Sequence, residues 1–224
     1  MSSPSVVFGV SSEGKTVAEA LIADRAQAGE LLSAARQAGS DLAWAHSAAD
    51  LSELGFTRQW GYRKVAGRPL RGGSAGIVPL PDEEDSAELW AAAYRGQWGH
   101  KTPQPDQWPF DLPPGTVTLS LRLDGAIAGV CRVDPATGLI DAPGVVPAYR
   151  ADLSGYEALL RAALIFVDAP SAAVESWGEG PERLAVCERL GLTTAEYTPG
   201  WEFVLRGDPG SIPPVLHRIT EAGG

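Results

Sequence analysis

The stretch from residue 116 to residue 146 constrains the fold more than any other part of the sequence. Apolar and polar residues alternate along it with a period of two, and Asp-Gly, Pro or Gly residues interrupt the alternation. This pattern is typical of short strands joined by tight turns. It predicts three strands in an antiparallel meander, at 116–123, 126–134 and 138–146.

Helical spacing and turn residues divide the remaining chain. Before the meander we expect, in order, strand 5–10, helix 16–38 closed by Gly39, buried strand 41–46, extended chain 56–65, strand 77–80 and helix 81–97. After it we expect helix 156–167, strand 172–178, helix 181–190, a hairpin of 193–197 and 201–206 around Pro199-Gly200, and a tail helix near 215–220. This order excludes a doubly wound sheet and predicts an α+β fold with a mixed, mostly antiparallel central sheet and flanking helices.

A segment rich in glycine marks the clearest linker. In AGRPLRGGSAG, at 66–76, glycine and proline remove both helix and strand preference. We therefore place a domain boundary near residue 74, which gives a short segment 1–74, a main domain 75–206 and a tail 207–224. The basic residues around the linker are interpreted as a solvated surface; they are Arg58, Arg63, Lys64, Arg68 and Arg71.

Charge and composition narrow the range of partners and locations. Eighteen basic and 28 acidic residues give a net charge of −10, so we expect neither nucleic acid nor an anionic membrane as a partner. No apolar run approaches the roughly 20 residues that span a bilayer, and a cytoplasmic location is expected. Cys131 and Cys187 lie in apolar surroundings and are expected to be buried free thiols.

Three short motifs follow one another along the main domain. Residues 145–150 read Val-Val-Pro-Ala-Tyr-Arg at the end of the third predicted strand. Residues 150–155 read Arg-Ala-Asp-Leu-Ser-Gly and lead into a helix, and residues 180–192, GPERLAVCERLGL, end a helix in a Leu-Gly turn. In this order and spacing the motifs resemble the GNAT superfamily of N-acetyltransferases, over about residues 77 to 206.

The resemblance implies that acetyl-CoA, or another acyl-CoA, binds at the first two motifs as cosubstrate. A backbone N–H near Val145 or Val146 would bind the thioester carbonyl. Amides at a helix N-terminus would bind the pyrophosphate. The turn that presents them comprises Arg150, Ala151, Asp152, Leu153, Ser154 and Gly155. The family has a glycine where this chain has Leu153.

The resemblance also implies direct transfer of the acyl group to an amine, which needs a base and a proton donor. Asp141 is a candidate base on the fourth strand of the family's fold, and Glu175 lies on the next strand. A solvent-facing acid is the alternative interpretation of either residue. Cys187 stands where the family has the Tyr that acts as general acid. It is either a proton donor or a buried packing thiol.

A proline-rich loop before the meander corresponds to the acceptor cleft of the family. Its candidate substrate-binding residues are Trp98, His100, Trp108 and Phe110. Core filling and loop anchoring are the alternative explanation of these aromatic residues. None of the three histidines, His46, His100 and His217, has a partner at metal-ligand spacing, so no metal is expected.

The segment 1–74 is similar to the latter half of the main domain. GELLSAARQAG is similar to YEALLRAAL, SELGF to ERLGL and GYRKV to WEFVL. This pairing resembles degenerate tandem GNAT proteins of the mycothiol synthase type, with a partial repeat that packs on the main domain and does not bind CoA. The sequence thus predicts an acyl-CoA-dependent N-acyltransferase for a small amine. The alternatives are a catalytically inactive GNAT-like protein that binds a ligand or partner, and a structural homodimer.

Overall fold

The computed structural model describes residues 3–10, 15–73, 76–94, 115–177 and 180–207. These residues form a mixed α+β fold with mostly antiparallel strand pairing and flanking helices, as the sequence predicts. Contacts group the chain into two compact units. The first unit comprises Met1–Tyr62 and Thr198–Gly224, and the second comprises Arg63–Tyr197.

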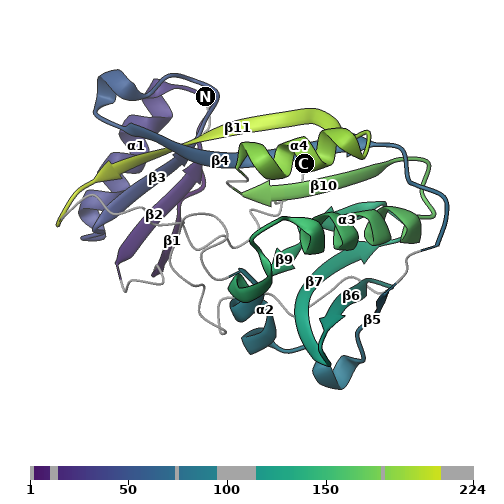
Figure 1. The fold of residues 1–224 in the computed structure, drawn as a ribbon. Helices are drawn as coiled ribbons and strands as arrows, with labels where there is room; N and C mark the ends of the chain where they lie inside the picture. Colours follow the sequence, from purple (N-terminus) through teal and green to yellow (C-terminus); the bar gives the residue numbers. More distant parts are fainter. Residues whose placement is uncertain (1–2, 11–14, 74–75, 95–114, 178–179, 208–224) are drawn as a thin grey trace. The chain divides into compact units, whose positions relative to one another are not determined.

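The second unit is built on the predicted meander. Its strands are β5 (Ile77–Pro79), β6 (Val117–Leu123), β7 (Ala126–Asp134), β8 (Leu139–Asp141), β9 (Gly144–Val145) and β10 (Ala172–Trp177). They lie in the order β10-β8-β7-β6-β5, and β9 also pairs with β7. Neighbouring strands are antiparallel except β8 and β10, which are parallel. The meander is confirmed, with β8 and β9 in place of a single third strand (Figure 1).

Helices cover both faces of this sheet. They are η2 (Asp82–Glu84), α2 (Ala87–Tyr94), η4 (Pro147–Tyr149), α3 (Ser154–Phe166) and α4 (Pro181–Arg189). Apolar side chains of α3 and α4 share one core with Cys131 and Ile140 of the sheet. Helix α2 packs Trp90 and Tyr94 against Val130 instead. Because successive side chains of a strand point to opposite faces, α2 covers the face away from α3 and α4.

The first unit contains a parallel strand pair joined by a helix. Its elements are β1 (Val7–Val10), β2 (Thr16–Leu21), α1 (Arg25–Gln37), β3 (Leu42–His46) and η1 (Ser52–Leu54). Strands β4 (Thr57–Gly67) and β11 (Thr193–Val204) have residues in both units. The strand order in the first unit is β1-β2-β3-β11, with β2 and β3 parallel. Helix α1 buries Leu31 and Leu32 against alanines of β2 and β3.

The predicted helix at 16–38 is wrong in its first part. Residues 16–21 form β2, which pairs with β1 and β3, and the helix begins at Arg25. Asp24 caps this helix, because its side chain accepts a hydrogen bond from the N–H of Gln27 (3.0 Å). The alanines of β2 have a high helix propensity, which led to the wrong prediction. In the structure their small side chains pack beneath α1. Gly39 follows the helix with φ +69°, as expected.

The predicted hairpin around Pro199 and Gly200 is also wrong. Both residues lie inside the continuous strand β11. A Cβ at Gly61 of β4 would be 2.1 Å from the carbonyl oxygen of Thr198 and 2.7 Å from the nitrogen of Gly200. The close approach of the two strands therefore requires glycine at position 61, and Pro199 and Gly200 continue the strand without a chain reversal. The predicted tail helix near 215–220 lies outside the described residues.

Two Leu-Gly motifs end in the same backbone conformation. Gly55 follows η1 with φ +85°, and Gly191 follows α4 with φ +80°. The next residues, Phe56 and Leu192, are both buried. Glycine is suited to both positions because positive φ carries no Cβ penalty for it. The partial repeat and its boundary near residue 74 stay predictions. The two compact units are defined by packing contacts, which do not test whether one part of the chain repeats another.

Replacement of Gly144 by Ala is expected to destabilise the protein by about 1–3 kcal/mol, because the new methyl group overpacks the contact with α2. A Cβ at Gly144 would lie 2.7 Å from Cε2 of Tyr94 and 3.1 Å from Cβ of Ala93. Urea unfolding followed by circular dichroism measures the change.

Gly29→Ala in α1 is the matched control. A Cβ at Gly29 would meet no atom within 4 Å, so this change is expected to stabilise the protein by roughly 0.5–1 kcal/mol. Equal effects of the two substitutions would show that the contact between Gly144 and Tyr94 is not tight.

Candidate functional site

The passage from β8 to β9 contains an extra residue. Ile140 of β8 pairs with Val133 of β7, whereas Gly144 of β9 pairs with Val130. Between these two pairs, three residues (141–143) therefore face two on β7 (131–132), which defines a β-bulge. The pairing with β10 ends at the same place, where the N–H of Ala142 donates to the carbonyl of Glu175 (3.1 Å). Beyond it β9 pairs with β7, and no pairing with β10 is observed among the described residues. We call this place, where the pairing of the strand with β10 ends, the wedge.

The wedge is lined on one side by the backbone of β9. The N–H of Val146 donates to the carbonyl of Ala128 on β7 (2.9 Å). Because alternate residues of an antiparallel strand turn their backbone groups to opposite sides, Val145 turns its N–H and C=O away from β7. The sequence offers two candidates for binding the thioester carbonyl. The N–H of Val146 is engaged in the ladder with β7, whereas that of Val145 is directed away from β7.

Two side chains fasten the bulge to α2. Arg150 donates from Nε and Nη2 to the carbonyl of Val145 (2.9 and 2.6 Å) and from Nη2 to the carbonyl of Ala93 (3.0 Å). The hydroxyl of Tyr94 donates to the carbonyl of Ala142. The resemblance predicts that Arg150 belongs to the pyrophosphate turn. In the structure its guanidinium binds backbone carbonyls at the edge of the wedge.

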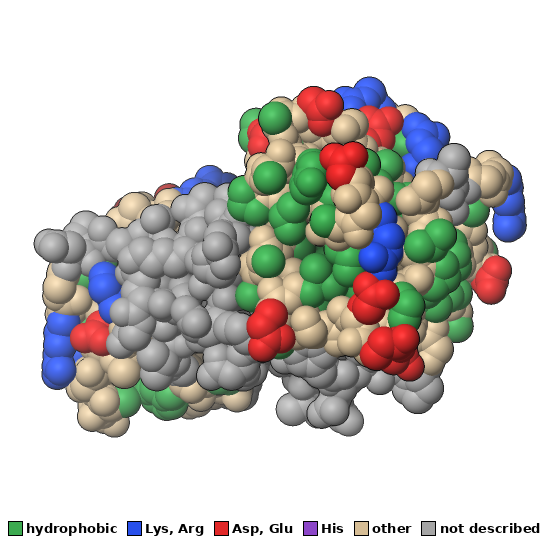
Figure 2. Space-filling model, turned by 60° about the horizontal axis from the view of Figure 1, so that its bottom comes forward, with side chains coloured by type: hydrophobic (Ala, Val, Ile, Leu, Met, Phe, Trp, Pro, Cys, Tyr) green, Lys and Arg blue, Asp and Glu red, His purple; other side chains and the backbone are tan. Residues whose placement is uncertain are grey.

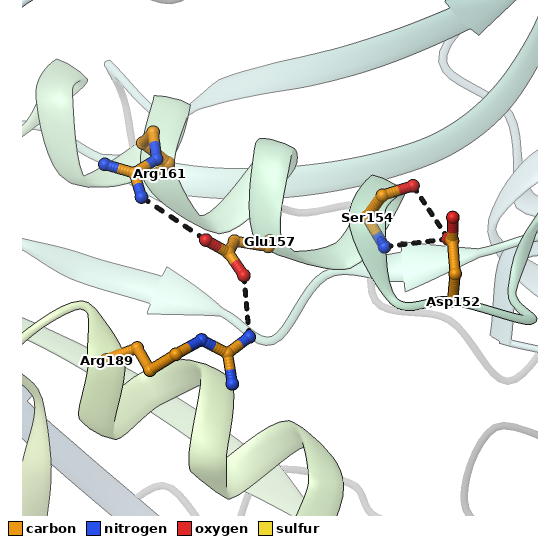
Figure 3. A network of polar contacts seen from close by, with 5 residues as sticks. All are labelled: Asp152, Ser154, Glu157, Arg161 and Arg189. Atoms are coloured by element: carbon orange, nitrogen blue, oxygen red, sulfur yellow. Dashed lines mark hydrogen bonds and ion pairs between the residues drawn. The ribbon is translucent and has the colours of Figure 1, made fainter.

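The predicted pyrophosphate turn leads into α3, as expected. Leu153 precedes the helix with φ +60° and ψ +3°, a left-handed conformation that suits glycine. Asp152 accepts hydrogen bonds from the N–H (3.0 Å) and hydroxyl (2.7 Å) of Ser154 (Figure 3). These bonds lower the pKa of the Asp152 carboxyl. A negative charge therefore already occupies part of the helix N-terminus, and Ala151 beside it is exposed.

The first turn of α3 packs closely on the sheet. A Cβ at Gly155 would lie 3.0 Å from Cδ2 of Leu121, so a larger residue would fit only if the Leu121 side chain shifted. Glu157 accepts from Arg161 (3.3 Å) and from Arg189 of α4 (2.7 Å), as Figure 3 shows. The bond from Arg189 is the main reason that the pKa of Glu157 is lowered.

The two candidate bases lie side by side. Glu175 of β10 and Asp141 of β8 are register partners on parallel strands, so both side chains point to the face that α2 covers. Both are half-buried. Nζ of Lys64 lies 3.4 Å from Oε1 of Glu175. Lys64 was expected on a solvated surface beside the linker. Its contact with Glu175 leaves no local signal in the sequence, because the two strands lie far apart in the chain.

A buried polar cluster on the same face was also missed. The guanidinium carbon of Arg132 lies 4.0 Å from the centre of the Trp90 ring, and the residue is 4% exposed. Asp85 lies 3.8 Å from Nη2 of Arg132 and accepts from the hydroxyl of Thr118 (2.6 Å) and from the Trp90 indole. A single arginine inside the apolar run GVCRV was the available sequence signal for this cluster.

The remaining candidates are placed as follows. Cys187 is 2% exposed and lies in the core between α4 and the sheet, and Cys131 is also a buried free thiol, as predicted. Trp98, His100, Trp108 and Phe110 lie outside the described residues. The described part of the chain has no group of three or more His, Cys, Asp or Glu that could hold a metal ion. Nor does it have a helix long and apolar enough to cross a membrane.

Solved structures share the fold of this chain over most of its length. A GCN5-related N-acetyltransferase from Sphaerobacter thermophilus matches with a TM-score of 0.60 at 13% identity, covering 90% of this chain and 81% of that one. One from Kribbella flavida matches with a TM-score of 0.54 at 19% identity, covering 88% and 84%. The chain has a GNAT fold. At these identities the likeness establishes the fold alone.

A further GNAT structure is of a tandem protein. It comes from the clavulanic acid biosynthesis pathway and matches with a TM-score of 0.50 at 14% identity, covering 92% of this chain and 80% of that one. No protein-family model and no curated protein matches the sequence. The GNAT assignment therefore depends on the three-dimensional arrangement.

Replacement of Arg150 by Met is expected to destabilise the protein by about 1.5–3 kcal/mol, because the carbonyls of Val145 and Ala93 lose a charged donor. Arg161→Met is the control. Arg161 has a side chain 52% exposed and pairs with Glu157 at the helix surface, so its loss is expected to cost only about 0.3–0.5 kcal/mol. Urea unfolding measures both changes. Similar losses from the two variants would argue against a fastening role of Arg150.

Proposed function

We propose that the protein is an acyl-CoA-dependent N-acyltransferase that transfers an acetyl group, or a related acyl group, to a small amine. The observation that carries the proposal is the end of the pairing between β9 and β10, at a point where the backbone of Val145 turns away from β7. A backbone donor held in a rigid strand can stabilise the oxyanion that forms when an amine attacks a thioester. The helix N-terminus that follows the wedge supplies the anion-binding end.

The transfer needs no covalent enzyme intermediate. The amine nitrogen attacks the thioester carbon, the C–S bond breaks, and the proton lost by the amine is replaced by one gained by the departing sulfur. We assign the base role to Asp141, with Glu175 beside it on β10. Cys187 is the candidate proton donor, as the position of its family counterpart implies. Trp98, His100, Trp108 and Phe110 keep their predicted role as the residues that bind the acceptor.

The cosubstrate proposal is consistent with the start of α3. The first intrahelical bond there runs from the N–H of Glu157 to the carbonyl of Leu153 (2.9 Å), so the N–H of Gly155 precedes the helical ladder. Bound acetyl-CoA would supply the activated thioester. The turn Arg150 to Gly155 would hold its pyrophosphate, against the opposing charge of Asp152.

A second candidate function is a GNAT-like protein without catalysis that binds a ligand or partner. Two observations favour it. Cys187 lies in the core with 2% exposure where the family has a Tyr, and the Asp152 carboxylate occupies the N-terminus of α3. Titration with acetyl-CoA followed by an assay of thiol release in the presence of amines separates the two functions.

The remaining partner and location assignments are part of the proposal. We propose that the protein is cytoplasmic and can form a homodimer. We also propose that it binds neither nucleic acid nor a membrane, and that it has a degenerate tandem organisation. On the face drawn in Figure 2, acidic and basic side chains are scattered among apolar ones, and the described atoms form no broad basic patch. The net charge of −10 supports the same assignment.

Calorimetric titration with acetyl-CoA tests the cosubstrate. Wild-type protein is expected to bind, and Leu153→Gly to bind about two- to fivefold more tightly, because glycine takes the left-handed conformation without a Cβ. Asp152→Asn is expected to tighten binding by a similar factor, because it removes a like charge beside the diphosphate.

Asp134→Asn is the control for Asp152→Asn. Asp134 also accepts backbone hydrogen bonds, from Ala136 (3.0 Å) and Thr137 (3.2 Å), but it is the last residue of β7, next to the turn that leads to β8. Its replacement is expected to leave binding unchanged. Absence of acetyl-CoA binding by the wild type and by both turn variants would end the acyltransferase proposal.

A further inference from the structure

A row of charged side chains crosses neighbouring strands of the second unit, on the face where α2 packs. Glu175 of β10 and Asp141 of β8 are register partners, and β4 lies on the other side of β10. Val65 of β4 points into the core shared with α3 and α4, so Lys64 before it points to the opposite face. Its Nζ lies 3.4 Å from Oε1 of Glu175. Two carboxyls and one ammonium group therefore lie side by side.

The row has a second cation at its other end. Arg132 of β7 lies beyond Asp141 and points to the same face, because the neighbouring register pair Val133 and Ile140 points into the core. Asp85 lies 3.8 Å from Nη2 of Arg132, so this positive charge already has a carboxyl beside it. The cation at the β4 end of the row contacts a candidate base instead.

Two ionised carboxyls at register positions of neighbouring strands repel each other, because such strands lie only about 4.8 Å apart. Like charges in one site favour the protonation of one of the two groups, whereas an opposite charge close by favours their ionisation. A proton already held by the base would prevent it from accepting one from the amine. The side chains of Lys64 and Glu175 are 34% and 29% exposed, so solvent screens this ion pair only in part.

We propose that Lys64 is a positioning residue for the acyl transfer, an inference that rests on the proposed function. Its ammonium group holds Glu175 as a carboxylate on the β4 side and leaves Asp141, on the β8 side, as the base. The amine nitrogen loses its proton to Asp141 as its bond to the acyl carbon forms, and the departing sulfur gains one from the proton donor. Lys64 contacts none of the reacting atoms and acts through the charge and place of Glu175.

Other ionisable groups on the elements around the acid pair have contacts of their own. In the described part of the chain they include Asp85, Arg132, Tyr94, Arg150 and Cys131. Asp85 and Arg132 lie beside each other, and Tyr94 and Arg150 donate to backbone carbonyls. Burial raises the pKa of the Cys131 thiol, which therefore stays uncharged near neutral pH. Removal of the Lys64 charge is thus expected to act directly on the acid pair.

Lys64→Met keeps the length of the side chain and removes its charge. Thiol release from acetyl-CoA is measured against pH with small primary amines, n-butylamine among them, as acceptors. The acidic limb of the profile of kcat is expected to move up by about 0.5–1 pH unit, which lowers the rate on that limb about three- to tenfold. The KM for acetyl-CoA is expected to stay unchanged, because β4 lies outside the turn that would hold the pyrophosphate. Lys64→Arg keeps the charge and is expected to restore the profile.

Titration of the carboxyl carbons by NMR gives a second readout that needs no activity. The Asp141 signal is assigned by its loss in Asp141→Asn. Its titration midpoint is expected to move up by about 0.5–1 pH unit in Lys64→Met and to return to the wild-type position in Lys64→Arg. A lysine with a purely structural role would not move this midpoint. If Lys64→Met fails to fold, Lys64→Gln removes the same charge.

Arg122→Met is the matched control in the same unit, since Arg122 pairs with Glu84 and the two side chains are 35% and 40% exposed. It is expected to leave the pH profile and the Asp141 midpoint as in the wild type. An active wild type whose profile and midpoint are unchanged in Lys64→Met overturns the role of Lys64 and leaves the proposed function intact. An inactive wild type counts against the transferase, and the Asp141 midpoint then still decides whether Lys64 controls the acid pair.

Discussion

The single extra residue between β8 and β9 is the constraint on which the second unit depends. Before it, Ile140 and Ala142 point into the core beneath α3; after it, Val145 points there, so the alternation has shifted by one. The same shift moves the strand from its partner β10 to β7 alone. A regular strand would have kept its backbone groups in the ladder with β10.

A bulge of this kind persists only if surrounding contacts hold it. Arg150 and Tyr94 bind the carbonyls that the bulge removes from the ladder, and these carbonyls would otherwise be costly to bury. Gly144 lets the ring of Tyr94 come close enough for its bond, and Gly155 lets α3 start directly against β6. The polar bonds and the glycines therefore act together: each bond requires a close approach that a larger residue would prevent.

Local patterns predicted local structure well and long-range structure poorly. The period of two gave β6 and β7, and the Leu-Gly motifs marked the glycines at positive φ, because both signals are written within a few residues. The alanines of β2 and the Pro-Gly of β11 were misread, since their role is set by α1 and β4, which lie elsewhere in the chain. The sequence predicted which positions belong to the site. It could not predict the partners of Lys64, Arg132 and Arg150, because these partners lie far away in the chain.

The two units differ in how they compensate buried charge. In the second unit, Arg132 is buried beneath Trp90 but has Asp85 beside it, so the positive charge is matched. In the first unit, Glu202 is buried beside Trp44 with one oxygen unbonded among the described residues. Leu153 is a comparable departure, since it holds a conformation that suits glycine. Natural sequences keep such locally unfavourable choices mainly where function requires them. In this chain, residues that lower stability and gain no compensating contact are therefore a better guide to function than the three short motifs, which match the GNAT pattern only in part.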